Sequence, residues 1–144
     1  MAKNPPENMT RITPYIFYED VAAALDWLRK AFGFTERMRM PGPDGGVLHA
    51  EMTLDDGVIM IGNPGPQYQN PKAHGHVNQL IYVFVNDVDA HYAQAKAAGA
   101  TITAEPEDLF YGDRRYAADD LEGHQWNFAT HIRDVPPEEM QPSQ

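Results

Sequence analysis

The chain has 144 residues, enough for one domain or for two small modules that share a core. Hydrophobic residues make up 42% of it, there is no cysteine, and the formal net charge is −10. The lack of cysteine excludes disulfides and thiolate chemistry, and the negative charge disfavours phosphate backbones and anionic lipid, so we predict no nucleic-acid and no membrane partner.

The first half of the chain predicts a strand, a helix and three further strands. After a strand at 11–18, Asp20 suits a helix N-cap, and apolar residues at helical spacing continue to Gly33, where a C-terminal glycine cap belongs. Strands follow at 34–40, 47–54 and 58–61, separated by turn-forming residues. We therefore predict that residues 11–62 form one βαβββ module.

The second half, 78–131, repeats this order. Its predicted elements are a strand at 78–85, a helix from Asp87 to Gly99, a strand at 101–105 and a hairpin at 111–131. The helix caps recur at a constant offset, since 67 residues separate Asp20 from Asp87 and 66 separate Gly33 from Gly99. This repetition indicates an internal duplication and a second βαβββ module.

Three segments show no periodicity. Residues 63–77 are rich in proline, glycine and amides, which predicts a linker, and residues 1–10 and 132–144 predict a flexible N-terminal arm and a flexible tail. The polar N-terminus lacks the apolar stretch of a signal peptide and no apolar run reaches the length of a membrane span, so we expect a cytoplasmic location.

Several short motifs resemble one known superfamily. They are Pro14-Tyr15-Ile16, Ala31-Phe32-Gly33-Phe34, Val85-Asn86-Asp87-Val88-Asp89 and Asp120-Leu121-Glu122-Gly123-His124. With the duplicated βαβββ order, they resemble the vicinal oxygen chelate superfamily, which includes glyoxalase I, bleomycin-resistance proteins and extradiol dioxygenases. The pattern is most similar to the PhnB-like or bleomycin-resistance-like branch. The resemblance implies an α+β fold in which two βαβββ modules form cupped mixed sheets around a cleft, and it implies a homodimer.

In that fold, strand alternation sorts side chains between the helices and the cleft. The residues expected under the helices are Ile12, Ile16, Ala50, Met52, Ile81, Val83, Val85, Trp126 and Phe128. The residues expected to face the cleft are Thr13, Tyr15, Phe17, His49, Glu51, Leu80, Tyr82, Phe84, Gln125, Asn127 and Ala129. Among these, the predicted ligand-binding residues are Tyr15, Phe17, His49, Glu51, Tyr82, Phe84, Gln125 and Asn127. Aromatic rings with a few amides and one carboxylate suit a flat, partly apolar molecule.

Metalloenzymes of the superfamily take metal ligands from the first and last strand of each module. The resemblance places Thr13, Met60, Leu80 and Asn127 at those positions. Methionine and leucine do not supply the nitrogen or carboxylate ligands that such metals prefer. We therefore predict no metal at these positions and no cofactor, while a divalent metal bound elsewhere stays open.

Other polar residues admit alternatives. His49 and Glu51 lie two apart on one strand face, so they form a hydrogen-bonded pair, contact a ligand, or act in catalysis or at a displaced metal site. Arg114 and Arg115 either pair with Asp113, Asp119 or Asp120, or bind an anion at the cleft mouth. His91 is expected on a solvated helix face.

Three functions remain open. The favoured one is metal-independent binding of an aromatic or drug-like small molecule. The second is a lyase, isomerase or dioxygenase-type enzyme that uses Glu51, with His49, as base or through a displaced metal site, because a carboxylate in a partly apolar cleft can have a raised pKa. The third is a domain that serves protein association.

Overall fold

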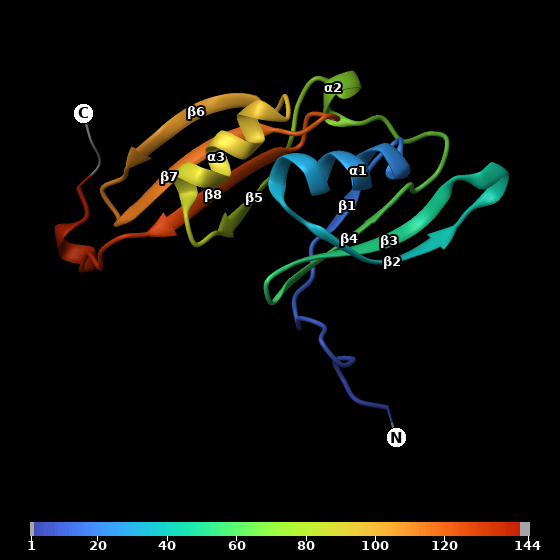
Figure 1. Cartoon of the computed structure of the whole chain (residues 1–144), viewed down its shortest axis with the longest axis horizontal. Coiled ribbons are helices and arrows are strands. Elements are labelled where there is room, and N and C mark those ends of the chain that lie inside the picture. The colour runs from blue at the N-terminus through green and yellow to red at the C-terminus, as the bar shows by residue number, and fades with distance from the viewer. Residues whose placement is uncertain (1, 142–144) are drawn as a thin grey trace.

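The computed structural model of the chain describes residues 2–141. The predicted arm and tail also include residue 1 and residues 142–144, which lie outside the described residues. Two four-stranded mixed sheets lie side by side in an elongated molecule, each with one long helix (Figure 1). Within residues 2–141, no helix is long and apolar enough to cross a membrane.

Module 1 contains β1 (Tyr15–Phe17), α1 (Val21–Phe32), β2 (Thr35–Pro41), β3 (Val47–Leu54) and β4 (Gly57–Gly62), with a short 3₁₀ turn at Pro43–Gly45. The strand order is β1-β4-β3-β2, and β1 pairs with β4 in parallel. Asp20 caps α1 by accepting from the Ala23 amide, and Gly33 ends it at φ +80°, where a side chain would be strained.

Module 2 contains β5 (Leu80–Phe84), α3 (Val88–Ala97), β6 (Thr101–Asp108), β7 (Asp113–Asp119) and β8 (Gln125–His131). Its strand order, β5-β8-β7-β6 with β5 parallel to β8, repeats that of module 1. Asp87 caps α3 as Asp20 caps α1. The predicted α+β fold with two βαβββ modules is therefore confirmed.

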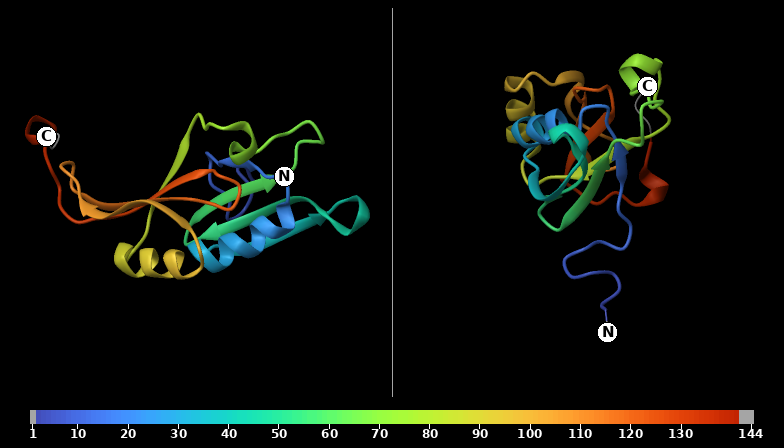
Figure 2. Two further views of the ribbon diagram at one scale, coloured as in Figure 1. Left: turned by 90° about the horizontal axis from the view of Figure 1, so that it is seen from above. Right: turned by 90° about the vertical axis from the view of Figure 1, so that its right-hand side faces the viewer.

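The core lies between the sheets and the two long helices. Helices α1 and α3 contact each other and lie on the same side of the sheets (Figure 2). Phe32 at the end of α1 packs against Trp126 and Phe128 of β8, so the aromatic core joins the two modules. Burial of these large side chains is the main force that holds the modules together.

The β7–β8 turn ties the modules together with hydrogen bonds. Glu122 accepts from the backbone amides of Glu19 and Asp20 at 2.7 and 2.9 Å. Asp120 accepts from the Tyr18 hydroxyl at 2.6 Å and from the Trp126 indole at 3.0 Å. Both carboxylates are buried, and each has enough donors to replace the water it has lost.

A histidine makes a second connection between the modules. His91 on α3 lies 2.7 Å from the carbonyl oxygen of Phe32 and 2.6 Å from the Tyr116 hydroxyl. The expectation that His91 is solvated is therefore wrong. In the neutral ring, Nε2 donates to the Phe32 carbonyl and Nδ1 accepts from Tyr116, and burial lowers the pKa of His91, which favours this neutral form.

The structure differs from the predicted elements in several places. Helix α3 has its C-cap at Ala98 rather than at Gly99, and β5 is shorter than the predicted strand at 78–85. Strand β1 is shorter than predicted, and Ile12, expected under a helix, is 87% exposed, so that placement is wrong. Strand β6 continues past Glu105 to Asp108. The segment 63–77 contains a short helix, α2 (Pro71–His74), whose N-cap Asn70 accepts from the Ala73 amide and donates to Glu122.

Candidate functional site

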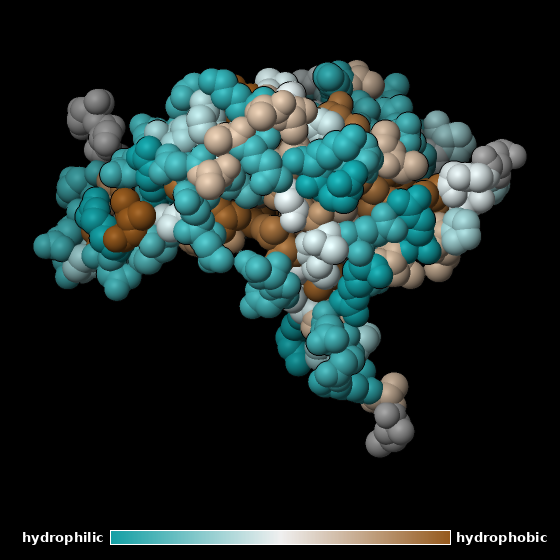
Figure 3. Space-filling view, viewed as in Figure 1, coloured by the Kyte–Doolittle hydropathy of each residue, from teal (hydrophilic) through white to brown (hydrophobic). Residues whose placement is uncertain are grey.

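Each sheet has one face toward the helices and one face away from them, which we call the open face. Residues that point toward the helices are buried in β1 and partly buried in β5, whereas their neighbours on the open face are exposed. The exposed aromatic residues there are Tyr15, Phe17, Tyr82 and Phe84. Figure 3 shows that hydrophobic atoms also gather along the junction of the two modules in a mainly hydrophilic surface. Large apolar side chains that stay exposed in a folded protein mark a binding surface.

On the open face of module 1, Tyr15 reaches across a neighbouring strand to a histidine. Tyr15 is in β1 and His49 is in β3, and β4 lies between them. The Tyr15 hydroxyl nevertheless lies 2.8 Å from Nδ1 of His49. The crossing requires a small residue in β4, because a Cβ added at Gly62 would lie 2.5 Å from that hydroxyl.

The contact continues to two charged side chains, Glu51 of β3 and Arg37 of β2. His49 Nε2 lies 3.7 Å from a Glu51 carboxylate oxygen, and the other oxygen lies 3.5 Å from Nε of Arg37. Arg37 also donates to the carbonyl oxygens of Glu7 and Asn8. The predicted pair His49 and Glu51 thus lies on one face, within a chain of four polar side chains that starts at Tyr15.

In module 2, a tyrosine again reaches across a neighbouring strand, but to a different partner. Tyr82 in β5 donates to Asp113 in β7 at 2.7 Å, and strand register places the buried Ala129 of β8 between them. Burial, together with Tyr111 and Asp113, raises the pKa of Tyr82, so it stays a neutral donor. Asp113 also accepts from His131 Nδ1 at 2.7 Å.

Beside this crossing, the open face of module 2 carries a guanidinium–amide pair. Arg115 donates to the Asn127 side-chain oxygen at 3.0 Å. Its Nε atom is buried and has no hydrogen-bond partner among the described residues. Arg115 faces Ala129 in strand register as His49 faces Gly62, so the two residues hold equivalent positions in the two modules.

The two neighbouring arginines lie on opposite faces of β7. Arg114 lies on the helix side, where it pairs with Asp89 of α3 at 3.1 Å and with Asp108 at 3.0 Å. Arg115 approaches Glu107 only to 3.7 Å. Pairing with Asp113, Asp119 or Asp120 was one of the two alternatives, and neither arginine forms such a pair, because Arg114 pairs with Asp89 and Asp108 instead.

The superfamily positions do not suit a metal. Asn127 uses its side-chain oxygen to accept from Arg115, Met60 offers only a thioether, and Leu80 offers no donor atom. Among residues 2–141, no three histidine, aspartate or glutamate side chains converge in a metal-binding arrangement. The residues present at these positions therefore do not fit the metal chemistry of the superfamily's enzymes.

Hollows at the edges of the open faces bring some predicted residues together. One of about 370 Å³ is lined by Tyr15, Phe17 and Tyr68 with three histidines, His74, His76 and His124. Another of about 330 Å³ is lined by Tyr82 and Phe84 beside apolar residues of β4 and β5. His124 and Tyr68 both donate to the Phe17 carbonyl oxygen, and sequence reasoning did not find this cluster because it draws on the linker.

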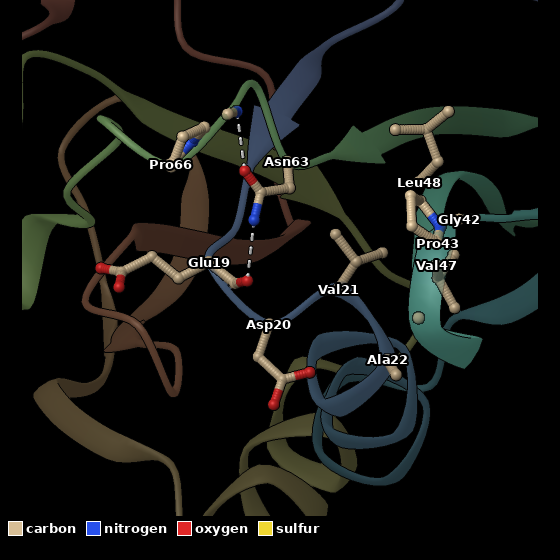
Figure 4. A pocket seen from close by; sticks show the side chains of 12 residues that line it. Glu19, Asp20, Val21, Ala22, Gly42, Pro43, Val47, Leu48, Asn63 and Pro66 are labelled. Atoms are coloured by element: carbon tan, nitrogen blue, oxygen red, sulfur yellow. Dashed lines mark hydrogen bonds between the residues drawn. The ribbon is translucent and has the colours of Figure 1, made fainter.

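A hollow of about 580 Å³ lies outside the predicted site, between the start of α1 and the β2–β3 connection (Figure 4). Its walls include Val21, Leu48 and Pro66, and the amide of Asn63 bonds to the Glu19 carbonyl oxygen and to the Gly65 amide. The carboxylate of Asp20 is engaged by α1. Because its polar groups are already paired, this hollow offers less to a ligand than the open faces do.

Comparison with known proteins gives consistent results. Residues 9–128 match the family described as "Glyoxalase/Bleomycin resistance protein/Dioxygenase superfamily". An uncharacterized protein of Mycobacterium tuberculosis, Rv0887c, is 34% identical over 135 residues, which cover 90% of this chain and 79% of the relative.

Solved structures show the same fold. TioX from Micromonospora sp. ML1 is 36% identical, with a TM-score of 0.69 over 84% of this chain and 99% of TioX. The fosfomycin resistance protein FosX of Listeria monocytogenes, solved in complex with Mn(II), is 14% identical, with a TM-score of 0.62 over 83% of this chain and 88% of FosX. At that identity FosX supports the fold alone.

Proposed function

We propose that this chain, which belongs to the glyoxalase/bleomycin resistance protein/dioxygenase superfamily, is a small-molecule-binding protein of the bleomycin-resistance-like branch. Its ligand is a flat, partly aromatic compound held between open faces, without a metal, and it acts in the cytoplasm. The proposal rests on the open-face residues described above and on the poor fit of the superfamily's metal positions.

The observation that carries the proposal is the pair of exposed aromatic residues on the first strand of each module. Tyr15 and Phe17 are 45% and 44% exposed, and Tyr82 and Phe84 are 37% and 60% exposed. The same 67-residue spacing that relates the helix caps relates Tyr15 to Tyr82 and Phe17 to Phe84. Aromatic side chains presented beside a few polar groups suit stacking with a flat ligand.

A second copy of the chain completes the site. Further exposed apolar residues, Met38, Met40 and Leu80, lie on or beside the same faces. An unpaired apolar sheet face is stabilised by covering it, and the open face of another copy supplies the matching apolar surface. We therefore propose a homodimer whose clefts are lined by both copies.

The proposal is tested by titrating ¹⁵N-labelled protein with 2-naphthylmethanol, a neutral flat aromatic probe, while native mass spectrometry counts the subunits. We expect two subunits and chemical-shift changes centred on Phe17 and Tyr82. The double variant Phe17→Ala with Tyr82→Ala should lose them, and Ile132→Ala, which removes an exposed apolar residue after β8, should keep them. Equal binding by the double variant would rule out this face.

A second candidate function is proton transfer by the polar chain of module 1. The 2.8 Å contact of Tyr15 with His49, and the approach of Glu51 to His49, place an acid and a base on the surface that the ligand would contact. Such a site would serve a lyase or isomerase that abstracts a proton next to a carbonyl group.

Hydrogen–deuterium exchange of a bound carbonyl compound distinguishes proton transfer from simple binding. A bound carbonyl compound such as 2-acetylnaphthalene should exchange its methyl protons for deuterium in D₂O faster with protein than without it. His49→Gln or Glu51→Gln should remove the acceleration, and unaltered acceleration in both variants would leave binding as the function.

A further inference from the structure

Arg115 has more donors than it has partners. A guanidinium carries five N–H donors, and Arg115 uses one of them for Asn127 at 3.0 Å. Its Nε is buried without a partner among the described residues, and its Nη2 stays 3.7 Å from Glu107. The edge formed by Nε and Nη2 is thus the unpaired edge of the guanidinium, and a planar anion that uncovers Nε can bind both donors with two oxygens.

The charge of Arg115 is only weakly compensated. Glu107, the nearest carboxylate, is 62% exposed, so water screens its attraction to the guanidinium. By contrast, Arg114 on the other face of the same strand has two carboxylates at hydrogen-bonding distance. A cation with an unused bidentate edge, beside aromatic side chains, is the arrangement that recognises a carboxylate on an aromatic molecule.

Other acidic groups on this face do not oppose an anion strongly. Asp113 already accepts from Tyr82 and from His131. The hydrogen bonds of His131 to Asp113 and to Asp134 raise the pKa of His131 and favour its positive form. Asp119 lies at the other end of β7, where burial and then the Asp120 charge raise its pKa and favour the neutral acid.

We propose that Arg115, held in place by Asn127, is the anchor for a carboxylate carried by the aromatic ligand. The inference deepens the proposed binding function and rests on it. The ligand is then an aromatic carboxylic acid. Its orientation in the cleft also follows, with the acid group over β7 and the ring over Tyr82 and Phe84 of β5.

The experiment compares two probes of nearly equal shape, 2-naphthoate and 2-naphthylmethanol, by NMR titration of the full chain. The wild type should bind 2-naphthoate about tenfold or more tightly than the alcohol, because a charge-assisted bidentate contact adds at least that factor. Arg115→Gln should lose the preference and still bind the alcohol, and Arg115→Lys, which keeps the charge but loses the fork, should bind with intermediate affinity. Arg114→Gln is the matched control and should keep the preference.

The outcomes separate this inference from the function on which it rests. If the alcohol binds the open face and 2-naphthoate binds no more tightly, or if Arg115→Gln keeps the preference, the Arg115 anchor is overturned and aromatic binding stands. If neither probe shifts the open-face resonances, both are overturned. Thermal unfolding of Arg115→Gln confirms that the variant is folded, and Arg115→Lys supplies the same comparison if it is not.

Discussion

Both modules contain a tyrosine that reaches across a neighbouring strand, and the two tyrosines have different hydrogen-bond partners. In each, a tyrosine on the first strand crosses a small residue on the last strand, Gly62 or Ala129, to reach a polar side chain on the third strand. Tyr15 meets a histidine in module 1, whereas Tyr82 meets a carboxylate in module 2.

The two contacts differ in whether the direction of the hydrogen bond is fixed. The hydroxyl of Tyr82 must donate, because Asp113 only accepts, so its orientation is fixed. The contact of Tyr15 with His49 allows either atom to donate, depending on the tautomer, so its direction is not fixed. Arg115 replaces His49 at the equivalent position, which gives module 2 a guanidinium where module 1 has an imidazole ring.

The largest expected effect contrasts the last hairpin turns of the two modules. Glu122→Ala should lower the free energy of unfolding by about 3 kcal/mol, because it leaves the amides of Glu19 and Asp20 and the side chain of Asn70 without their charged acceptor. Urea unfolding measures this value. The control is Asp56→Ala in the exposed β3–β4 turn, which should change stability by less than about 0.5 kcal/mol. Equal losses in the two variants would mean that the β7–β8 turn has no special role.

A smaller effect compares the two crossing tyrosines. Tyr82→Phe should lower the free energy of unfolding by about 1.5 kcal/mol, because the buried carboxylate of Asp113 loses a donor. Tyr15→Phe should cost about 0.5 kcal/mol, since its hydroxyl bond to His49 is more accessible to water. Chemical denaturation of both variants measures the difference, and a larger loss for Tyr15→Phe would reverse the expected order of the two contacts.

The smallest effect is a difference in pH dependence between two histidines. Burial lowers the pKa of His91, so its contribution to stability falls as pH drops below the unfolded value of about 6.5. Hydrogen bonds to Asp113 and Asp134 raise the pKa of His131, so its contribution is complete below about pH 6.5 and is lost as pH rises through the folded pKa.

Two variants test these opposite signs. His91→Gln should be less destabilising near pH 5.5 than near pH 8.5, and His131→Gln should show the reverse order. Urea midpoints at the two pH values decide the matter. The same sign for both variants would contradict the contrast between His91 and His131.

Sequence patterns predicted the elements well where a single local signal decides the structure. Strand 47–54 has the predicted bounds because its alternation matches two different environments, and Asp20, Gly33 and Asp87 cap the helices as predicted. Ile12 was misplaced because alternation alone does not show where strand pairing starts. Helix α2 was missed because it is only four residues long and depends on a distant contact, that of Asn70 with Glu122.

The candidate site was predictable only in part. Alternation gave the faces of Tyr15, His49 and Glu51, but Arg114 and Arg115 were treated alike and were not placed on opposite faces of β7. Alternation did not give the contact of Tyr15 with His49, which crosses a strand, since this contact depends on the small size of Gly62. The predicted metal-free character and ligand binding stay predictions.

The contact of Glu122 with Glu19 and Asp20 also forms late during synthesis of the chain. The partners are 103 and 102 residues apart in sequence. On a ribosome that adds about 5–20 residues per second, the start of α1 therefore waits roughly 5–20 s for its acceptor. During that interval the nascent module 1 also lacks Trp126 and Phe128 of β8, which cover Phe32 at the end of α1 in the finished protein.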